Sequence, residues 1–365
     1  MSRFCLVHLA LGLVATANLI AQTPSASPKI SAPPAGSPTA TAARALSTEQ
    51  LINSLSPADL QAAITLLKAN FAKPDVISET NLNRATLQGL MVRLGHGLMV
   101  LPDKAHAATE PVTPFYGEVL ENHIGYLRPG SLTNANLQMT DKKLVEFSSK
   151  KVDGLIIDLR SSAADDFAAA ADLAKRFCPK GKTLFTLRKA GKQERVFTSD
   201  RDPTFQGLTF VLVDGDTGGG AEAVASAVRG LNKALTIGQP TAGSAVEYSD
   251  LPLPSGKILR VAVSEVAAAD GQSLYPEGVK PDLPVDMAMA DKRQIFQMSM
   301  DKGMGPFVYE TERPHFNEAA LMAGTNPELE SAEQRRGRAQ ERVPRDAVVQ
   351  RALDLITSLE VYQKR

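Results

Sequence analysis

The strongest constraint on the fold comes from residues 208–228, where a buried strand pattern, a glycine-rich turn and an amphipathic helix pattern follow one another. Leu208–Val213 reads LTFVLV, an apolar run that favours a strand covered on both faces. Three glycines, Gly218–Gly220, follow it. The next segment places four small or branched residues on one helical face: Ala221, Val224, Ala225 and Val228. A buried strand leading into such a helix predicts a layered α/β domain.

The same alternation extends over a predicted core of residues 115–290. We expect further strands at Leu120–Leu127, Gly154–Leu159 and Ala234–Ile237, and a helix from about Asp141. Another helical face consists of Phe167, Ala170, Ala171, Ala174 and Phe177. Two further strand patterns flank Pro254-Ser255-Gly256, a hairpin signal, and they are Leu251–Leu253 and Lys257–Val263.

Helical patterns flank this core on both sides. Residues 47–105 predict a small helical domain, with a capping box at Ser47 and Gln50 and a second helix starting at Ser56-Pro57. The faces of its second and third helices (the third over about 80–95) carry Leu60, Ala63, Ile64 and Leu67, then Leu87, Leu90, Met91 and Leu94. Residues 291–365 predict an extension with a charged linker over 327–345. After Asp346 a terminal helix carries the apolar stripe Val349, Ala352, Leu353, Ile356 and Leu359.

The N-terminus has the pattern of a secretory signal peptide over residues 1–21. Arg3 precedes an apolar run, Phe4–Ala17, and small residues at Ala17 and Ala21 offer cleavage sites. An uncleaved anchor and a buried helix are the alternatives, although the run is short for a bilayer span. Residues 22–46 hold five prolines among small polar residues and predict an extended linker. We therefore expect an exported protein, periplasmic or extracellular, without a membrane span after signal removal.

Composition argues against several function classes. Forty Lys and Arg balance forty Asp and Glu, so no overall basic field favours nucleic acid as a partner. The five histidines are scattered and the two cysteines, Cys5 and Cys178, are far apart, which argues against a zinc site. We expect Cys178 to be buried and inert. No cofactor is expected.

Two motif-like features receive ordinary structural interpretations. Gly218–Ala223 fits the loose dinucleotide pattern G-x-G-x-x-A, but the chain about 20 residues on, GQPTAG, has no carboxylate for a ribose. No Lys-Ser/Thr pair follows the glycines, so a phosphate-binding Walker loop is absent. The methionines Met287, Met289, Met298, Met300 and Met304 favour core filling or a soft contact surface, with copper binding the weaker alternative.

Six segments in sequence order resemble the core of the C-terminal processing, or tail-specific, serine peptidase family. They are HIGYLRPGSL, LIIDLR, FVLVDGDTGGGAEAVASAV, ALTIGQPTAG, LPLPSGKILRVAVSEV and PEGVKPDLPV, within residues 117–286. The resemblance implies a Clp protease/crotonase-like core of ββα units. The PDZ domain often found before that core has no room here.

The resemblance also implies a catalytic Ser–Lys pair, and this sequence departs from it at three places. Ala221 stands where the family has its nucleophile, directly before Glu222. Ser244 stands at the position of the lysine base, 23 residues further on. Ala164 and Asp165 replace the Gly-Gly turn that would stabilise the oxyanion. Nucleophile, base and oxyanion turn are all altered.

Two classes of function remain open. The first is a non-catalytic family member that binds a peptide or protein or acts as a scaffold. The second is a weakly active or rewired hydrolase acting on protein C-termini. The remaining site would consist of Gly220, Glu222, Thr241, Gly243, Ser244 and Tyr248. Replacement catalytic groups are possible at Ser226, Thr217, Ser249 and Lys233, although each is better explained as an ordinary turn, loop or helix-surface residue. The sequence leaves the oligomeric state open.

Overall fold

The structure, a computed structural model, describes residues 47–102, 112–160, 162–308 and 344–363. The predicted signal peptide and linker, and most of the charged linker, lie outside these residues. The chain divides into two compact units, Met1–Pro74 and Asp75–Arg365. This division falls inside the helical domain predicted over 47–105, so the third helix belongs to the larger unit.

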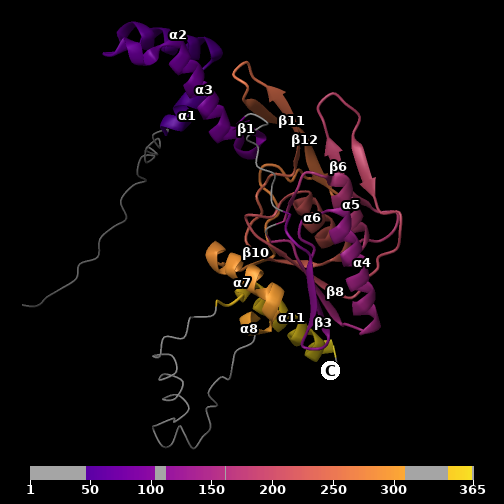
Figure 1. The fold of residues 1–365 in the computed structure, drawn as a ribbon. Helices are drawn as coiled ribbons and strands as arrows, with labels where there is room; N and C mark the ends of the chain where they lie inside the picture. Colours follow the sequence, from indigo (N-terminus) through magenta and orange to yellow (C-terminus); the bar gives the residue numbers. More distant parts are fainter. Residues whose placement is uncertain (1–46, 103–111, 161, 309–343, 364–365) are drawn as a thin grey trace, which may run out of the picture. The chain divides into compact units, whose positions relative to one another are not determined.

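A six-stranded sheet forms the centre of the larger unit (Figure 1), in the order β13-β10-β8-β4-β3-β2. Its strands are β2 (Tyr116–Leu120), β3 (Ile124–Arg128), β4 (Gly154–Asp158), β8 (Leu208–Val213), β10 (Leu235–Gly238) and β13 (Leu283–Pro284). All neighbours are parallel except β2, which runs antiparallel to β3. The strands expected at Gly154 and Leu208 are confirmed, and they are buried neighbours with Ile156 opposite Phe210.

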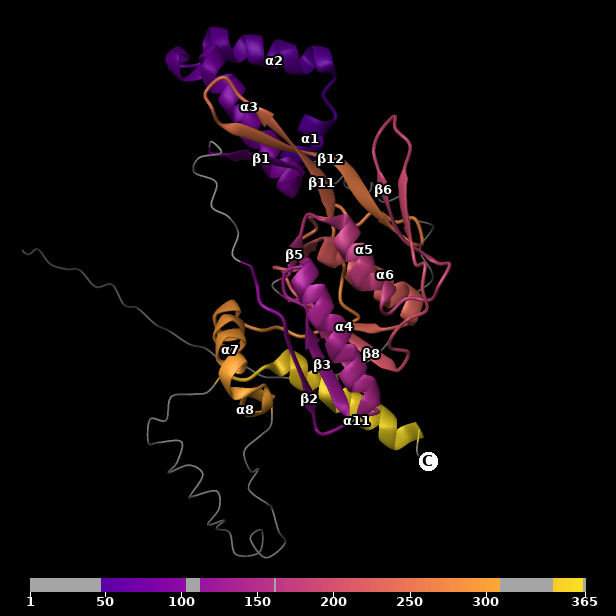
Figure 2. The same ribbon diagram turned by 45° about the vertical axis from the view of Figure 1, so that its right-hand side comes forward.

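Helices cover both faces of this sheet. One apolar core contains Leu155, Ile157 and Val211 together with the helices α4 (Asn134–Ser149), α5 (Phe167–Lys175) and α6 (Gly220–Asn232). The alternate strand residues Ile156 and Phe210 enter a second core with α7 (Met289–Lys302), α8 (Gly305–Val308) and α11 (Ala347–Gln363). Figures 1 and 2 both place α7, α8 and α11 close together. A sheet covered on both faces requires strands as apolar as these.

A second sheet lies beyond α5 and α6. Its strands are β1 (Leu98–Leu101), β6 (Thr183–Arg188), β7 (Arg195–Thr198), β11 (Val246–Pro252) and β12 (Ile258–Ala268), with β12 pairing β1, β6 and β11. Helix α6 contacts β8 of the first sheet and β6 and β12 of the second. A short parallel pair, β5 (Ala163–Ala164) and β9 (Gly218–Gly219), completes the unit. The α/β class is therefore confirmed.

Three predicted elements differ in their bounds. The strand expected over Leu120–Leu127 is two strands, because Glu121 and Asn122 adopt positive φ values and turn the chain back. The helix expected from Asp141 begins at Asn134, where Thr133 caps it by accepting from the Asn136 N–H at 3.3 Å. Residues 98–101, expected to be helical-domain sequence, form β1 because they pair with β12.

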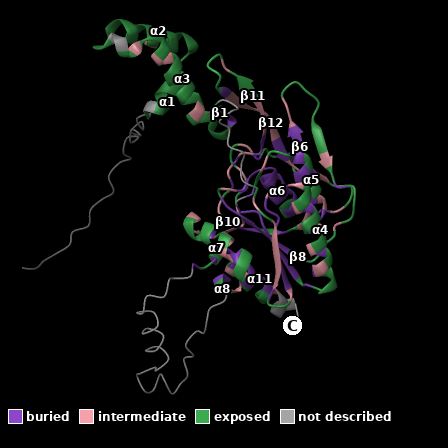
Figure 3. Ribbon diagram, in the orientation of Figure 1, coloured by how far each residue is buried: buried purple, intermediate pink, exposed green. Residues whose placement is uncertain are grey.

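The N-terminal helices form where the capping signals predict them. They are α1 (Thr48–Asn53), α2 (Pro57–Asn70) and α3 (Glu79–Leu94), joined by the 3-10 turn η1 (Pro74–Ile77), and a second 3-10 turn, η2 (Gly95–Gly97), follows α3. Ser47 and Gln50 form the expected capping box, and Pro57 opens α2. Neither α2 nor α3 has a buried residue, however (Figure 3).

The C-terminal helix is confirmed as a docked element. In α11, Val349, Ala352, Leu353 and Ile356 are buried against the first sheet. Ile356 lies so close to β4 that a Cβ on Gly154 would be 3.1 Å from it. Cys178 is buried as predicted, and burial raises the pKa of its thiol to about 12. Among the described helices, none combines the length and apolar character needed to cross a bilayer.

Candidate functional site

The glycine-rich turn after β8 is tied to the turn after β4. Thr217 donates its hydroxyl hydrogen to the carbonyl oxygen of Leu159 at 3.0 Å and accepts from the Asp214 N–H at 3.0 Å. The Gly218 N–H donates to the carbonyl oxygen of Ser162 at 2.9 Å. Two strand ends that are adjacent in the parallel sheet are thereby held together at their carboxyl edge.

The glycines are required by close backbone approach. Gly219 has a φ of +57°, and a Cβ there would lie 2.3 Å from the carbonyl oxygen of Ala164. A Cβ on Gly220 would lie 2.9 Å from the methyl group of Ala170. Only glycine at 219 lets this turn lie against Ala164, the residue before Asp165.

Ala221 is the second residue of α6 and is completely buried. It therefore lies in the first turn of the helix that follows the glycine-rich turn. Its side chain is a single methyl group, which has no atom able to attack a carbonyl or to exchange a proton. The position retains the backbone geometry of a strand-to-helix junction and carries no nucleophile.

Glu222 is the polar centre of the site. Its buried carboxylate accepts hydrogen bonds from three backbone N–H groups, those of Gly219 at 3.0 Å, Gly243 at 2.7 Å and Ser244 at 2.8 Å. The Thr241 hydroxyl is a further donor. Burial raises the pKa of Glu222, while these hydrogen bonds act in the opposite direction. Glu222 therefore caps its own helix and anchors the segment 241–244.

Ser244 lies beside the same turn. Its hydroxyl oxygen accepts from the Gly219 N–H at 3.1 Å, and a Cβ built on Gly218 would lie 2.7 Å from that oxygen. Gly243 has a φ of +65° and passes so close to the Pro276 carbonyl that a side chain is excluded. The structure thus brings Ser244 to the N-terminal turn of the helix that carries Ala221.

Polar side chains border the junction between the glycine-rich turn, Gly218–Gly220, and the first turn of α6. Asp165 is exposed directly after β5, and its negative charge acts on both Tyr248 and Arg260. Burial, and then the charge of Asp165, raises the pKa of Tyr248 to about 12, so its phenol is neutral near pH 7. The Tyr248 hydroxyl donates to the His96 carbonyl oxygen at 2.9 Å. Arg260 forms a two-pronged pair with Asp250 at 2.8 and 3.0 Å.

The alternative catalytic groups do not gather at the junction. The Thr217 hydroxyl is buried and bonded within the turn. Ser226 lies in the middle of α6, and Lys233 is the exposed residue that ends this helix in a left-handed conformation. Ser249 lies on β11, opposite Val261 of β12. None of the four contacts Ala221 or Glu222 through a hydrogen bond among the described residues.

The described residues contain no group of three His, Cys, Asp or Glu side chains able to hold a metal ion. Two sulfur atoms of the methionine cluster instead face guanidinium groups: Met287 accepts from Arg160 at 3.4 Å, and Met300 accepts from Arg128 at 3.5 Å. Met304 is buried in the second core.

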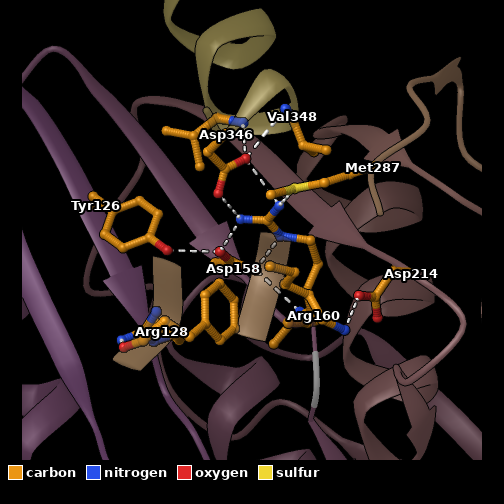
Figure 4. Close-up of polar contacts among 12 residues, drawn as sticks. Tyr126, Arg128, Asp158, Arg160, Asp214, Met287, Asp346 and Val348 are labelled. Carbon is orange, nitrogen blue, oxygen red and sulfur yellow. Dashed lines mark hydrogen bonds and ion pairs between the residues drawn. The ribbon is translucent and has the colours of Figure 1, made fainter. Parts of the chain in front are cut away.

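The sequence did not predict the buried charged residues that support the turns after β4 and β8. Figure 4 shows Asp158, Arg160 and Asp346 in contact, with Tyr126 and Met287 around them. Lys292, also buried, pairs with Asp214. Arg160 follows the GLIIDL strand that the sequence did predict, but its partner Asp346 is 186 residues away. No local pattern reveals such a pair.

The α/β core that contains this junction is similar to a family of peptidases. Residues 123–285, a little under half of the chain, match the family described as Peptidase family S41. The carboxy-terminal processing protease CtpA of Bacillus subtilis (strain 168) is 24% identical over 179 residues, which cover 49% of this chain and 38% of that protein. A carboxyl-terminal-processing protease of Synechocystis is 24% identical over 172 residues, or 47% and 40% of the two chains.

Solved structures of similar description also align. A putative peptidase from Parabacteroides merdae gives a TM-score of 0.49 at 15% identity, covering 66% of this chain and 85% of that one. The photosystem II D1 C-terminal processing protease gives 0.43 at 20% identity, covering 49% of both chains. The chain spans about two fifths of the length of the curated relatives it matches.

Proposed function

We propose that this chain is a non-hydrolysing member of peptidase family S41 that binds an extended peptide or protein segment beside Ala221 and Ser244. One observation carries the proposal. At the junction where the family resemblance places the nucleophile, the side chain is the buried methyl group of Ala221. The neighbouring position for the base is the hydroxyl of Ser244, which accepts a hydrogen bond from the Gly219 N–H at 3.1 Å.

The magnitude of the loss supports this proposal. Removing the nucleophile of a serine peptidase lowers turnover by roughly a millionfold. The Ser244 hydroxyl does not replace a lysine amine as a base at neutral pH, because a neutral hydroxyl binds protons far more weakly. Asp165, next to the expected oxyanion position, would further repel the negative charge that develops during acyl transfer.

Strand β11 supports binding of an extended ligand. It begins at Val246, two residues after Ser244, and pairs on one side with β12. No described strand pairs with its other edge. An extended peptide can add to such an edge through main-chain hydrogen bonds and so reach Ser244. The relatives are named as carboxy-terminal processing proteases, so a protein C-terminus is the ligand we propose.

The test is direct binding of fluorescent, unstructured peptides with free C-termini, measured by the fluorescence anisotropy of the peptide. We expect saturable binding that an unlabelled peptide with a free C-terminus displaces. Asp165→Arg should change the affinity severalfold, because this exposed carboxylate borders the junction. The matched control is Asp172→Arg, whose side chain is 55% exposed on α5 and should leave the affinity unchanged.

Two results would overturn the proposal. The first is the absence of saturable binding by any peptide in the set. The second is turnover of the bound peptide by the unmodified protein, which would favour a weakly active or rewired hydrolase.

We further propose that the chain is exported to the periplasm or the outside of the cell. Its support is the charged, apolar and small-residue order of residues 1–21. Mass analysis of the chain isolated from its native cells should give an N-terminus directly after Ala17 or Ala21. A chain that still begins at Met1 would contradict export with removal of a signal peptide.

A further inference from the structure

Each of the two turns that meet at the junction contains one member of a buried ion pair. The first turn follows β4 and contains Arg160, and the second follows β8 and contains Asp214. Their partners, Asp346 and Lys292, both come from the C-terminal extension. This extension lies after the region 123–285 that matches the peptidase family.

The first pair is completely enclosed. Arg160 and Asp346 have side chains 1% and 0% exposed, and two hydrogen bonds of 3.0 and 2.8 Å join them (Figure 4). The same guanidinium binds Asp158 at 2.9 and 2.7 Å, and Tyr126 donates to Asp158 at 2.6 Å. Asp346 also caps α11, because it accepts from the Val348 and Val349 N–H groups at 3.2 and 3.0 Å. The cap of α11 is therefore fixed to the residue that begins the first turn.

The second pair acts on the glycine-rich turn. Lys292 of α7 is 2% exposed and donates to Asp214 and, at 3.0 Å, to Asp216. The other oxygen of Asp214 accepts from the Asp216 N–H at 3.0 Å. Thr217, whose N–H donates to the Asp214 carbonyl oxygen at 2.9 Å, leads directly into Gly218. One ammonium group thus holds both carboxylates of the turn that precedes α6.

Stability alone is a weak reason for such an arrangement. Enclosing charges in a protein interior costs desolvation free energy, and apolar residues of similar size often stabilise a fold as well or better. The pairs instead fix positions, because a charge-assisted hydrogen bond is strong only over a narrow range of distances and angles. Each pair therefore constrains the backbone of one of the two turns at the junction.

We infer that Lys292 and Asp346 are positioning residues through which the C-terminal extension sets the geometry of the two turns at the peptide site. The inference rests on the proposed function only in that these turns border the proposed ligand. Loss of either pair should loosen its own turn while the sheet stays folded.

Hydrogen exchange in the unliganded full chain tests this inference. The variants are Lys292→Met, which keeps the length of the side chain, and Asp346→Asn, which keeps a good helix cap. We expect Thr217 and Gly218 amides to exchange about tenfold faster or more in Lys292→Met, since a hydrogen bond to a charged group is worth at least that factor. Asp346→Asn should do the same to the Ser162 amide, which donates to the Leu159 carbonyl oxygen.

Controls separate local loosening from general destabilisation. Amides of the β2–β3 pair should keep their protection in both variants. Lys280→Met and Asp354→Asn remove exposed charges of the same types and should change none of these amides. The double variant Asp214→Asn with Lys292→Met leaves no buried unpaired charge, so global stability should recover while the turn amides stay fast.

Three outcomes would overturn the inference: unchanged turn amides in both single variants, uniformly faster exchange in all strands, or full recovery of turn protection in the double variant. Failure of the wild-type chain to bind peptides is a separate result. It would contradict the proposed function and leave the exchange measurement, made without ligand, to decide this inference.

Discussion

Glu222 shows how one buried side chain organises several segments. Its two oxygens connect the first turn of α6 with the backbone at Gly243 and Ser244. A carboxylate fits this place because it accepts several hydrogen bonds and donates none. Glutamine would present an amide group to at least one of the same donors.

The titration of Glu222 should be visible in stability. Burial raises its pKa above the ordinary 4.5, so the folded state holds the proton more tightly than the unfolded state. The contribution of this titration to the free energy of unfolding is therefore fully present below pH about 4.5, and it declines as pH rises through the higher pKa of the folded state. Urea unfolding measures the free energy of unfolding of the wild type and of the non-titrating Glu222→Gln variant. The wild-type value minus the variant value should fall from acid to neutral pH. A difference that grows over that range would mean the pKa is lowered instead.

Restoring peptidase chemistry should need three substitutions. Ala221→Ser alone supplies a hydroxyl without a base, and Ser244→Lys supplies an amine that must be neutral to act. The carboxylate of Asp165 would favour the charged ammonium and repel the oxyanion, so Asp165→Gly is required as well. We expect measurable hydrolysis of unstructured peptides only by the triple variant, at a rate well below that of an active relative.

The control for this series keeps Ala221 and carries only Ser244→Lys with Asp165→Gly. It should be inactive and should not react with an active-serine probe, whereas the triple variant should react. Equal activity of the two would show that the serine at 221 is not the nucleophile.

At the scale of elements, two apolar helices of similar pattern have different surroundings. Helix α11 buries its stripe against the first sheet, whereas α2 has no buried residue in the described structure. Sequence periodicity identifies such a stripe but does not say whether anything covers it.

A matched pair of leucines measures this difference. Leu353 on the apolar stripe of α11 is 1% exposed, and Leu67 on the apolar face of α2 is 49% exposed. Leu353→Ala should lower the free energy of unfolding by about 2–5 kcal/mol, through lost burial and a cavity. Leu67→Ala should change it by less than about 0.5 kcal/mol. Denaturant unfolding checks both, and a large loss at Leu67 would reveal a partner covering α2.

Much of the fold can be predicted because its main elements carry strong local signals. The strands at Gly154 and Leu208 are continuous apolar runs, and the glycine turn directly precedes α6. By contrast, α7 was missed. Its buried residues, Lys292, Ile295 and Ser299, include only one apolar side chain. Strands β6 and β7 were also not predicted.

The candidate site divides in the same way. The positions of Ala221 and Ser244 follow from motif order and spacing, and the structure brings Ser244 to the turn before Ala221. The supporting charges could not be predicted, because Lys292 and Asp214 are 78 residues apart and Arg160 and Asp346 are 186 apart. Only the folded chain brings these pairs together.

At the scale of the whole molecule, the region that matches the peptidase family model is a minority of the chain, and other segments complete its fold. The matched region ends at residue 285, and α7, α8 and α11 then cover one face of its sheet. Without them, apolar residues of β3, β4 and β8 on that face would be exposed to water. The described helices of the extension are therefore part of the folded core.

The central claim is that this core retains a ligand site without hydrolysis, and one measurement tests it most directly. Purified wild-type chain is incubated with a peptide it binds, and the peptide is followed by mass spectrometry over many hours. The account predicts that the peptide remains intact while bound. Cleavage by the wild type that disappears in Ser226→Ala or Ser244→Ala would contradict it and identify a rewired hydrolase.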